Sequence, residues 1–250
     1  MRKLLECAMD IGEQMLISGA EVHRVEDSIS RMCCSFGAVR TDVFIITSSM
    51  VVTVYTKEGE CYTQTKRIQG IATDMEKVHR LNDLSRKICG TNMTVEEIRK
   101  EIKEHIDSKP YPFWVISICY AMIAAAFTAF FGGELNEILV SPIVGFITSF
   151  ITWGSDKAGM NQVIEKFLCS FFVTVFSFLF MKFGCIGSVD KVIIGNIMTL
   201  IPGIGLTNAI RDLFVGDSIA GILRTVEAVL TALAISGGYF LFVLMMGGAL

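Results

Sequence analysis

The chain has 250 residues, of which 52% are hydrophobic, and its formal net charge is −3. A mean hydropathy of +0.55 is unusual for a soluble protein, and no basic field exists to attract nucleic acid, so nucleic-acid binding is excluded. The first 110 residues hold 16 of the 22 Lys and Arg and all three His. We therefore predict a cytoplasmic α+β domain at 1–110 and a transmembrane domain at 111–250.

The first domain alternates between helical and strand-like patterns. Four segments carry apolar residues at helical spacing: 5–16, 22–36, 78–88 and 98–106. Three segments between them are rich in Val, Ile, Thr, Tyr and Phe: 39–48, 51–57 and 61–68. The order α-α-β-β-β-α-α predicts a small α+β module.

Local signals mark the ends of these elements. Ser18-Gly19 separates the first two helices, and Glu58-Gly59-Glu60 favours a hairpin between the last two strands. Asp74 is a predicted N-cap of the third helix. Thr94 and Glu97 have the spacing of a capping box, which predicts the start of the fourth helix.

A dense polar cluster surrounds the junction of the first two helices. Its members are Ser18, Gly19, Glu21, His23, Arg24, Glu26 and Asp27. A hydrolytic site could be drawn from Ser18, His23 and a carboxylate, but residues two and five apart on or near a helix converge poorly. No nucleophile elbow, Walker loop or His-Glu-x-x-His motif is present. We expect a solvated, capping helix face and no catalytic residue. The alternative is a regulatory or ligand site formed by Ser18, Gly19, Glu21, Arg24 and Glu26.

The eight cysteines do not form a recognisable framework. There is no Cys-x-x-Cys, and no His lies at zinc-ligand spacing from a Cys. We expect reduced cysteines that act as small hydrophobic residues, with no metal or cofactor.

Five apolar runs follow the first domain. They cover 113–131, 138–153, 167–181, 192–210 and 228–250. Because a hydrocarbon core takes about 20 apolar residues per helix, we predict an all-α bundle of five transmembrane helices. Small residues at four-residue spacing favour close packing in four runs. These stripes are Ala121, Ala125 and Ala129; Ser141, Gly145 and Ser149; Gly195, Thr199, Gly203 and Thr207; and Ala228, Ala232 and Ser236.

The distribution of basic residues predicts the orientation. Lys and Arg are dense in the first domain, occur in the second and fourth loops, and are absent from the first loop and the C-terminal end. This places the N-terminus in the cytoplasm and, with five crossings of the plasma membrane, the C-terminus outside. Lys182 and Lys191 in the third loop oppose this orientation without reversing it.

The fourth run is interrupted. Asn196 lies near its start, Ile201-Pro202-Gly203 breaks its middle, and Asn208 lies near its end. Pro removes a backbone hydrogen bond, and interrupted apolar segments are typical of transporter binding sites. A kinked structural helix is the alternative.

Charged residues cluster just beyond this run: Arg211, Asp212, Asp217, Arg224 and Glu227. Arg224 and Glu227 are three residues apart on a predicted helix, so they share a face and can pair. In a cavity such residues bind substrates or protons, whereas at the rim of a bundle they are solvated.

Two separated blocks resemble the signature of the threonine/serine exporter family. The second block comprises Ile201-Pro202-Gly203, Asn208-Ala209-Ile210-Arg211-Asp212, Gly216-Asp217, Gly221 and Arg224. The N-terminal block comprises 16–21, 24–27 and 78–85. The resemblance covers nearly the whole chain.

The resemblance implies a subunit of a transporter. The longest family members have about twice as many spans, so this chain is similar to the larger subunit of a split form that works with a separate, small multi-span protein. A hetero- or homo-oligomer is expected. Known cargoes of the family are threonine and serine, with succinate-like dicarboxylates as the alternative. An ion gradient, of protons above all, is the expected driving force, since no nucleotide-binding motif is present.

This reading assigns the transport site to the broken run and its flank. The site would comprise Asn196, Pro202, Gly203 and Asn208, with Arg211, Asp212, Asp217, Arg224 and Glu227 at its cytoplasmic mouth. Arg211 or Arg224 would hold a substrate carboxylate, and Asp217 or Glu227 an amine or a coupling proton. The soluble module would gate, sense substrate or hold the partner. A membrane-tethered hydrolase and a non-transporting sensor or scaffold are the competing hypotheses.

Overall fold

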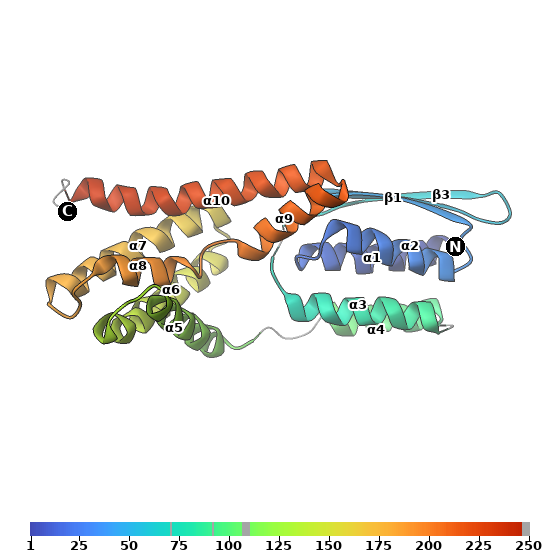
Figure 1. Ribbon diagram of the computed structural model, residues 1–250. Coiled ribbons are helices and arrows are strands. Elements are labelled where there is room, and N and C mark those ends of the chain that lie inside the picture. The colour runs from blue at the N-terminus through green and yellow to red at the C-terminus, as the bar shows by residue number, and fades with distance from the viewer. Residues whose placement is uncertain (71, 92, 107–110, 247–250) are drawn as a thin grey trace. The chain divides into compact units, whose positions relative to one another are not determined.

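A computed structural model describes residues 1–70, 72–91, 93–106 and 111–246, and these are mostly helical with one small sheet (Figure 1). The chain forms two compact units. Unit 1 comprises Met1–Lys109 and Gly203–Val226, and unit 2 comprises Pro110–Pro202 and Glu227–Leu250. Residues 203–226 thus join the first unit, although they follow the predicted boundary. That boundary at residue 110, and the last four residues of the fifth apolar run, lie outside the described residues.

Unit 1 is built from helices and a three-stranded sheet. Its elements are α1 Arg2–Ile17, α2 Val22–Ser35, β1 Arg40–Ile46, β2 Ser49–Tyr55, β3 Cys61–Arg67, α3 Met75–Gly90, α4 Val95–Ile106, α9 Gly203–Val215 and the start of α10 Ser218–Met245. The pair α1 and α2 lies between the sheet and the pair α3 and α4 (Figure 1). The core therefore forms around α1, whose Leu5, Met9 and Met15 have no exposed surface.

The sheet and the caps follow from local sequence. The strands are antiparallel in the order β1-β2-β3, and alternate residues Met50, Val52 and Val54 of β2 are fully buried, as period-two patterning requires. The predicted caps are confirmed. The Asp74 carboxylate accepts the Lys77 backbone N–H at 2.9 Å. The Thr94 N–H donates to Glu97 Oε2 at 2.8 Å, while Thr94 Oγ1 accepts the Glu97 N–H at 3.3 Å.

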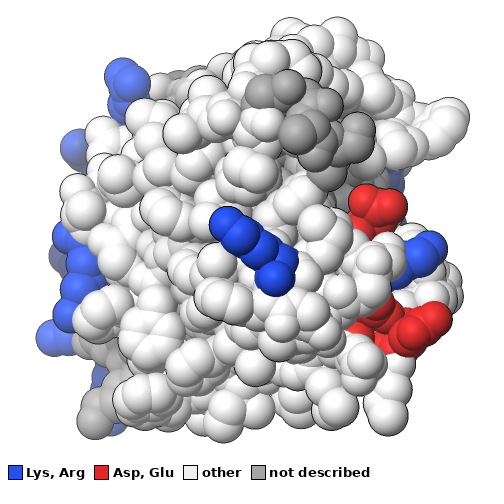
Figure 2. Space-filling view, turned by 90° about the vertical axis from the view of Figure 1, so that its left-hand side faces the viewer, with Lys and Arg blue, Asp and Glu red and all other residues white. Residues whose placement is uncertain are grey.

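Unit 2 is an apolar helical bundle. Its elements are α5 Phe113–Phe130, α6 Leu135–Lys157, α7 Gln162–Lys182, α8 Val189–Ile197 and the rest of α10. Among the described residues, α5, α6, α7 and α10 are the 4 helices long and apolar enough to cross a membrane. Figure 2 looks onto the side of Figure 1 where unit 2 is drawn and shows mostly uncharged residues. The sides of these helices carry exposed large apolar residues, among them Trp114, Leu139 and Leu233, as expected for a protein that contacts lipid.

The structure does not confirm a single transmembrane helix over 192–210, and it shows the break predicted at Ile201-Pro202-Gly203. This run forms two shorter helices, α8 and α9, and α9 belongs to unit 1. Pro202, which has no backbone N–H, lies between them, and the helix restarts at Gly203. The described residues therefore contain four candidate membrane helices and not five.

Small residues bring α5 and α6 close together. The predicted stripe Ser141, Gly145 and Ser149 is buried, but α5 faces it with Ser117, Ala124 and Thr128. The predicted α5 stripe ending at Ala129 is wrong, since Ala129 is exposed. A Cβ on Gly145 would lie 2.9 Å from both the Ala124 Cβ and the Tyr120 carbonyl oxygen. The backbones can approach this closely only because residue 145 has no side chain.

We predict that Gly145→Val destabilises unit 2, because the new side chain would collide with backbone as well as with Ala124. Overpacking of this kind costs about 1–3 kcal/mol. The measurement is the melting temperature of the purified chain in detergent. Gly154→Val is the matched control, since Gly154 lies in the same helix with nothing within 4 Å of its position for a Cβ. Equal melting temperatures for both variants would contradict this account of the contact.

Candidate functional site

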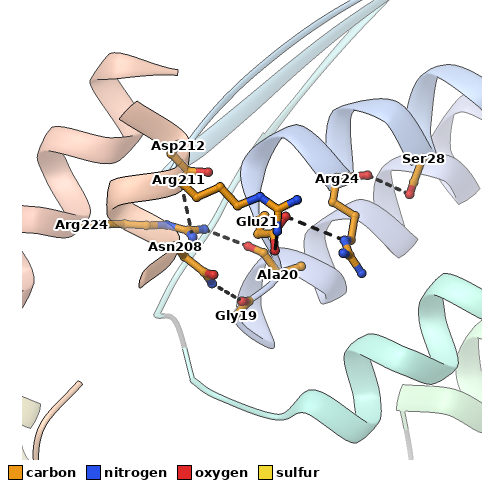
Figure 3. A network of polar contacts seen from close by, with 9 residues as sticks. All are labelled: Gly19, Ala20, Glu21, Arg24, Ser28, Asn208, Arg211, Asp212 and Arg224. Atoms are coloured by element: carbon orange, nitrogen blue, oxygen red, sulfur yellow. Dashed lines mark hydrogen bonds and ion pairs between the residues drawn. The ribbon is translucent and has the colours of Figure 1, made fainter. Parts of the chain in front are cut away.

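The polar cluster predicted after the first helix belongs to a network within unit 1 (Figure 3). Its centre is the turn between α1 and α2, residues 18–21. Gly19 adopts φ +90°, and a Cβ there would lie 2.9 Å from the Ala72 carbonyl oxygen. The turn therefore requires glycine, both for its backbone conformation and for the close approach of Ala72.

Three side chains from α9 and α10 hold this turn. Asn208 Nδ2 donates to the Gly19 carbonyl at 3.1 Å, and Arg224 Nη2 donates to the Ala20 carbonyl at 2.9 Å. Arg211 Nη1 donates to Glu21 Oε1 at 2.7 Å (Figure 3). The two sequence blocks, about 190 residues apart along the chain, are thus in direct contact.

Arg224 is the buried member of this network. Its side chain is 6% exposed, and its Nη1 lies 3.4 Å from Oδ2 of Asp212, whose side chain is 1% exposed. Burial raises the pKa of Asp212, and the neighbouring Arg224 charge opposes that rise. Arg224 and Glu227, which their spacing would allow to pair, form no ion pair with each other. Arg224 faces Asp212 and the turn, whereas Glu227 is exposed and makes no ion pair with a described residue.

A groove of about 780 Å³ lies beside the network in unit 1. It is lined by one face of α2, one face of α3 and a side chain of α9. Its arginines are Arg24, Arg31, Arg86 and Arg211, and its acidic residues are Glu21 and Asp27. Arg24, Arg31 and Arg211 pair with these two carboxylates, but Arg86 forms no ion pair with a described residue. The groove therefore has an excess of positive charge suited to a carboxylate ligand.

One group in unit 1 has the composition of a metal site, where the sequence predicted none. A ligand atom from each of His23, Glu26 and Asp217 lies within 4.8 Å of the other two. Burial and the nearby Asp217 carboxylate raise the pKa of Glu26 to about 7. No sequence motif joins these residues, because Asp217 comes from the turn between α9 and α10.

The hydrolytic arrangement considered from the sequence is not assembled. Ser18 is only 2% exposed, and its backbone carbonyl accepts the Asp74 N–H at 3.0 Å. No hydrogen bond between Ser18 Oγ and His23 occurs among the described residues. Ser18 acts as a structural residue of the turn.

Unit 2 contains a buried polar layer around Asn196. Asn196 Nδ2 donates to Ser141 Oγ at 2.9 Å and to the Val192 carbonyl at 2.8 Å. Thr128 Oγ1 donates to the same Ser141 hydroxyl at 2.7 Å. Asn196 is 1% exposed, and its Oδ1 has no hydrogen-bond partner among the described residues. The sequence analysis identified Asn196 but missed Thr128, whose hydroxyl inside an apolar run was the available signal.

Two buried glutamates of unit 2 and a half-buried lysine beside one of them were also missed. Glu137, 2% exposed, accepts the backbone N–H of Gly187 at 3.1 Å and of Ser188 at 3.0 Å, so it holds the residues that precede α8. Near the start of α7, Lys166 Nζ lies 3.0 Å from Glu165 Oε1, and the Glu165 side chain is 6% exposed. Sequence reasoning treated all three as loop or flanking residues.

Comparison with known proteins identifies the family. The family model described as "Putative threonine/serine exporter" matches residues 6–246. The chain belongs to this family. It is 23% identical over 247 residues to a "Probable succinate transporter subunit YjjP" of Klebsiella aerogenes, covering 98% of this chain and 93% of the relative. It is 21% identical to the protein of the same name from Escherichia coli K12, covering 93% of this chain and 91% of the relative. No solved structure is significantly similar to the chain.

Membership of this family identifies the broad functional class of the chain. The chain is a member of a transporter family with apolar membrane helices, and it is not an enzyme. The residues of both contact blocks, 16–21 and 208–224, lie within the matched segment.

We predict that Arg224→Met lowers the stability of unit 1 by about 3–5 kcal/mol, because it leaves the buried Asp212 carboxylate without its partner. Arg211→Met is the matched control. The Arg211 side chain is 57% exposed, so loss of its pair with Glu21 should cost about 1 kcal/mol or less. Urea unfolding of the purified chain measures both changes, and Asp212→Asn should recover part of the Arg224→Met loss. Equal effects of the two arginine variants would contradict the assigned burial.

Proposed function

We propose that the chain is one subunit of a secondary exporter of small carboxylate-bearing metabolites, driven by an ion gradient and working with a separate small multi-span subunit in the plasma membrane. The observation that carries this proposal is the buried polar layer at Asn196 inside an otherwise apolar bundle. Polar residues buried within a membrane bundle need hydrogen-bond partners, and they serve in helix packing as well as on substrate and ion pathways. The relatives are named as subunits, which supports a partner protein.

The proposed cargo is a carboxylate. The family is named for threonine and serine, and both relatives are named for succinate. These compounds share a carboxylate, and succinate has a second one in place of an amine. Because both similar proteins match over more than nine-tenths of this chain, succinate-like dicarboxylates are the first substrates to test. Threonine and serine follow.

Five crossings are supported by the path of the chain. Unit 1 contains both 1–109 and 203–226, so we place both segments on one side of the membrane. Between them α5, α6 and α7 each can cross, and three crossings leave the chain on the opposite side. Residues 183–202, which include α8, must then return it. α10 makes the fifth crossing.

The helix in the proposed return crossing is too short to span the membrane. The 9 residues of α8 span about 14 Å, roughly half of a 30 Å hydrocarbon core. The remainder contains the break that ends at Pro202, and irregular backbone at membrane depth must be buried in protein or line a wet cavity. Half-helices of this kind are typical of transporter sites. We therefore assign the transport site to Asn196, whose Oδ1 has no hydrogen-bond partner among the described residues, and to Pro202 and Gly203.

The residues beyond the break have different proposed roles. Arg224 and Asn208 bond to backbone carbonyls of the α1–α2 turn, which supports a coupling role over direct substrate binding. Asp212 neutralises Arg224. Arg211 is exposed in the arginine groove, so it keeps the proposed role of binding a carboxylate, there as part of a substrate sensor. Glu227, exposed on α10, remains the proposed acceptor of an amine or a coupling proton.

A non-transporting sensor is the second candidate function. The arginine groove favours it, because a carboxylate-binding groove is sufficient for sensing without a pathway. The two hypotheses differ at Asn196, which only an exporter needs.

The topology predicts the sidedness of loop reporters. With the N-terminus in the cytoplasm, alkaline phosphatase fused after Gly133 or Gly184 should be active outside. Fusions after Gly159 and Gly216 should be inactive, because these residues would lie in the cytoplasm. Activity after Gly216 would contradict a return crossing through α8.

The transport function predicts efflux that depends on Asn196. Cells loaded with labelled succinate or threonine should release one of them only when the chain is expressed with its small partner. Asn196→Ala should slow this efflux about tenfold. The loss of one buried hydrogen bond costs about 1.4 kcal/mol, and this energy corresponds to a tenfold change.

Asn136→Ala is the matched control, since Asn136 is exposed on α6. It should leave efflux unchanged. Unchanged efflux in Asn196→Ala would overturn the assigned site, and no efflux under any combination, with both proteins in the membrane, would favour the sensor.

A further inference from the structure

We propose that His23, Glu26 and Asp217 bind one divalent transition-metal cation, Zn²⁺ or Mn²⁺, which ties α2 to the turn between α9 and α10. The three residues belong to unit 1, and one ligand atom from each lies within 4.8 Å of the others. The inference does not depend on the proposed transport function.

The positions of the three ligands follow from the fold. His23 and Glu26 are three residues apart on α2, so they project from the same face of the helix. Asp217 lies between α9 and α10, where its backbone N–H donates to the Asp212 carbonyl at 2.9 Å. That bond orients the turn so that its carboxylate meets the α2 face.

The spacing is close to that of a coordination sphere. Zn²⁺ binds His nitrogen and carboxylate oxygen at about 2.0–2.2 Å, so two ligands of a tetrahedral ion lie about 3.4 Å apart. Because the three atoms lie within 4.8 Å of one another, they need to approach one another by at most about 1.4 Å. His23 is exposed and can make this adjustment by a change of rotamer.

The two carboxylates of this cluster have no cationic side chain of their own. No ion pair joins Glu26 or Asp217 to a Lys or Arg within the described ranges. Asp217 Oδ2 is shielded from solvent and has no hydrogen-bond partner among the same residues. A bound cation would compensate both charges and satisfy the free oxygen.

The ligand types select the class of metal. Ca²⁺ and Mg²⁺ prefer all-oxygen sites, whereas an imidazole with two carboxylates suits Zn²⁺, Mn²⁺ or Fe²⁺. Water would complete the coordination on the exposed side. The ion would join α2 to the α9–α10 turn beside the Arg211–Glu21 ion pair, which joins the same two parts of unit 1.

The test uses the full chain, purified in detergent and stripped of metals with EDTA. Titration with MnCl₂, followed by the electron paramagnetic resonance signal of free Mn²⁺, should show one bound ion per chain that ZnCl₂ displaces. His23→Ala and Asp217→Asn should each weaken binding by more than about 100-fold, since loss of even an outer-shell partner costs 10–100-fold. ZnCl₂ should also raise the melting temperature of the original chain but not of His23→Ala.

His79→Ala is the matched control, because the His79 side chain is 74% exposed and faces Asp83 at 3.4 Å on α3. It should bind Mn²⁺ as the original chain does. Binding that is equal in all variants would overturn the proposal by placing the ion elsewhere, for example on exposed cysteines. No binding of either ion would also overturn it, and would leave a proton shared between Glu26 and Asp217 as the explanation of their contact.

Discussion

The buried guanidinium of Arg224 is the interaction on which the arrangement of unit 1 depends. It bonds to the Ala20 carbonyl and faces the Asp212 carboxylate, so it connects α10, α9 and the turn between α1 and α2. A charge that is 6% exposed is tolerated only when its partners are in place. The buried Arg224 charge and its partners therefore fix residues 203–226 against the N-terminal residues of unit 1. Asn208 and Arg211 reinforce it from the more accessible side.

A different constraint governs unit 2. Its helices are apolar, and in lipid the hydrophobic effect does not drive helices together, so close contact depends on small residues and interhelical hydrogen bonds. Gly145 permits the approach of α5 and α6, and Ser141 links Thr128 with Asn196 across three helices. Within the described part of the chain, the same polar layer leaves Asn196 Oδ1 without a hydrogen-bond partner near the end of the short helix α8. Packing and the proposed transport site thus use the same residues.

One segment of unit 1, residues 203–226, is joined to unit 2 at both of its ends. Residues 203–226 belong to unit 1, yet they follow the break after α8 and continue into the part of α10 that belongs to unit 2. A change in the groove or at the α1–α2 turn would act on this segment through Arg211 and Arg224, which the segment itself carries. Because the chain is continuous, such a change would be passed to the break before Gly203 and to α10. This is the physical basis of the coupling role proposed for these residues.

The sequence by itself determined the features that depend on neighbouring residues: the helical and strand periods, the caps at Asp74 and Thr94, the apolar runs and the interruption at Pro202. These follow from local sterics and hydrogen bonding, which short segments carry in full. Only the tertiary structure decided that 203–226 packs with the first residues, that Arg224 faces Asp212 and not Glu227, and that Asp217 meets His23 and Glu26. Each of these contacts joins residues on different elements, and sequence spacing carries no information on which distant groups will share a buried environment.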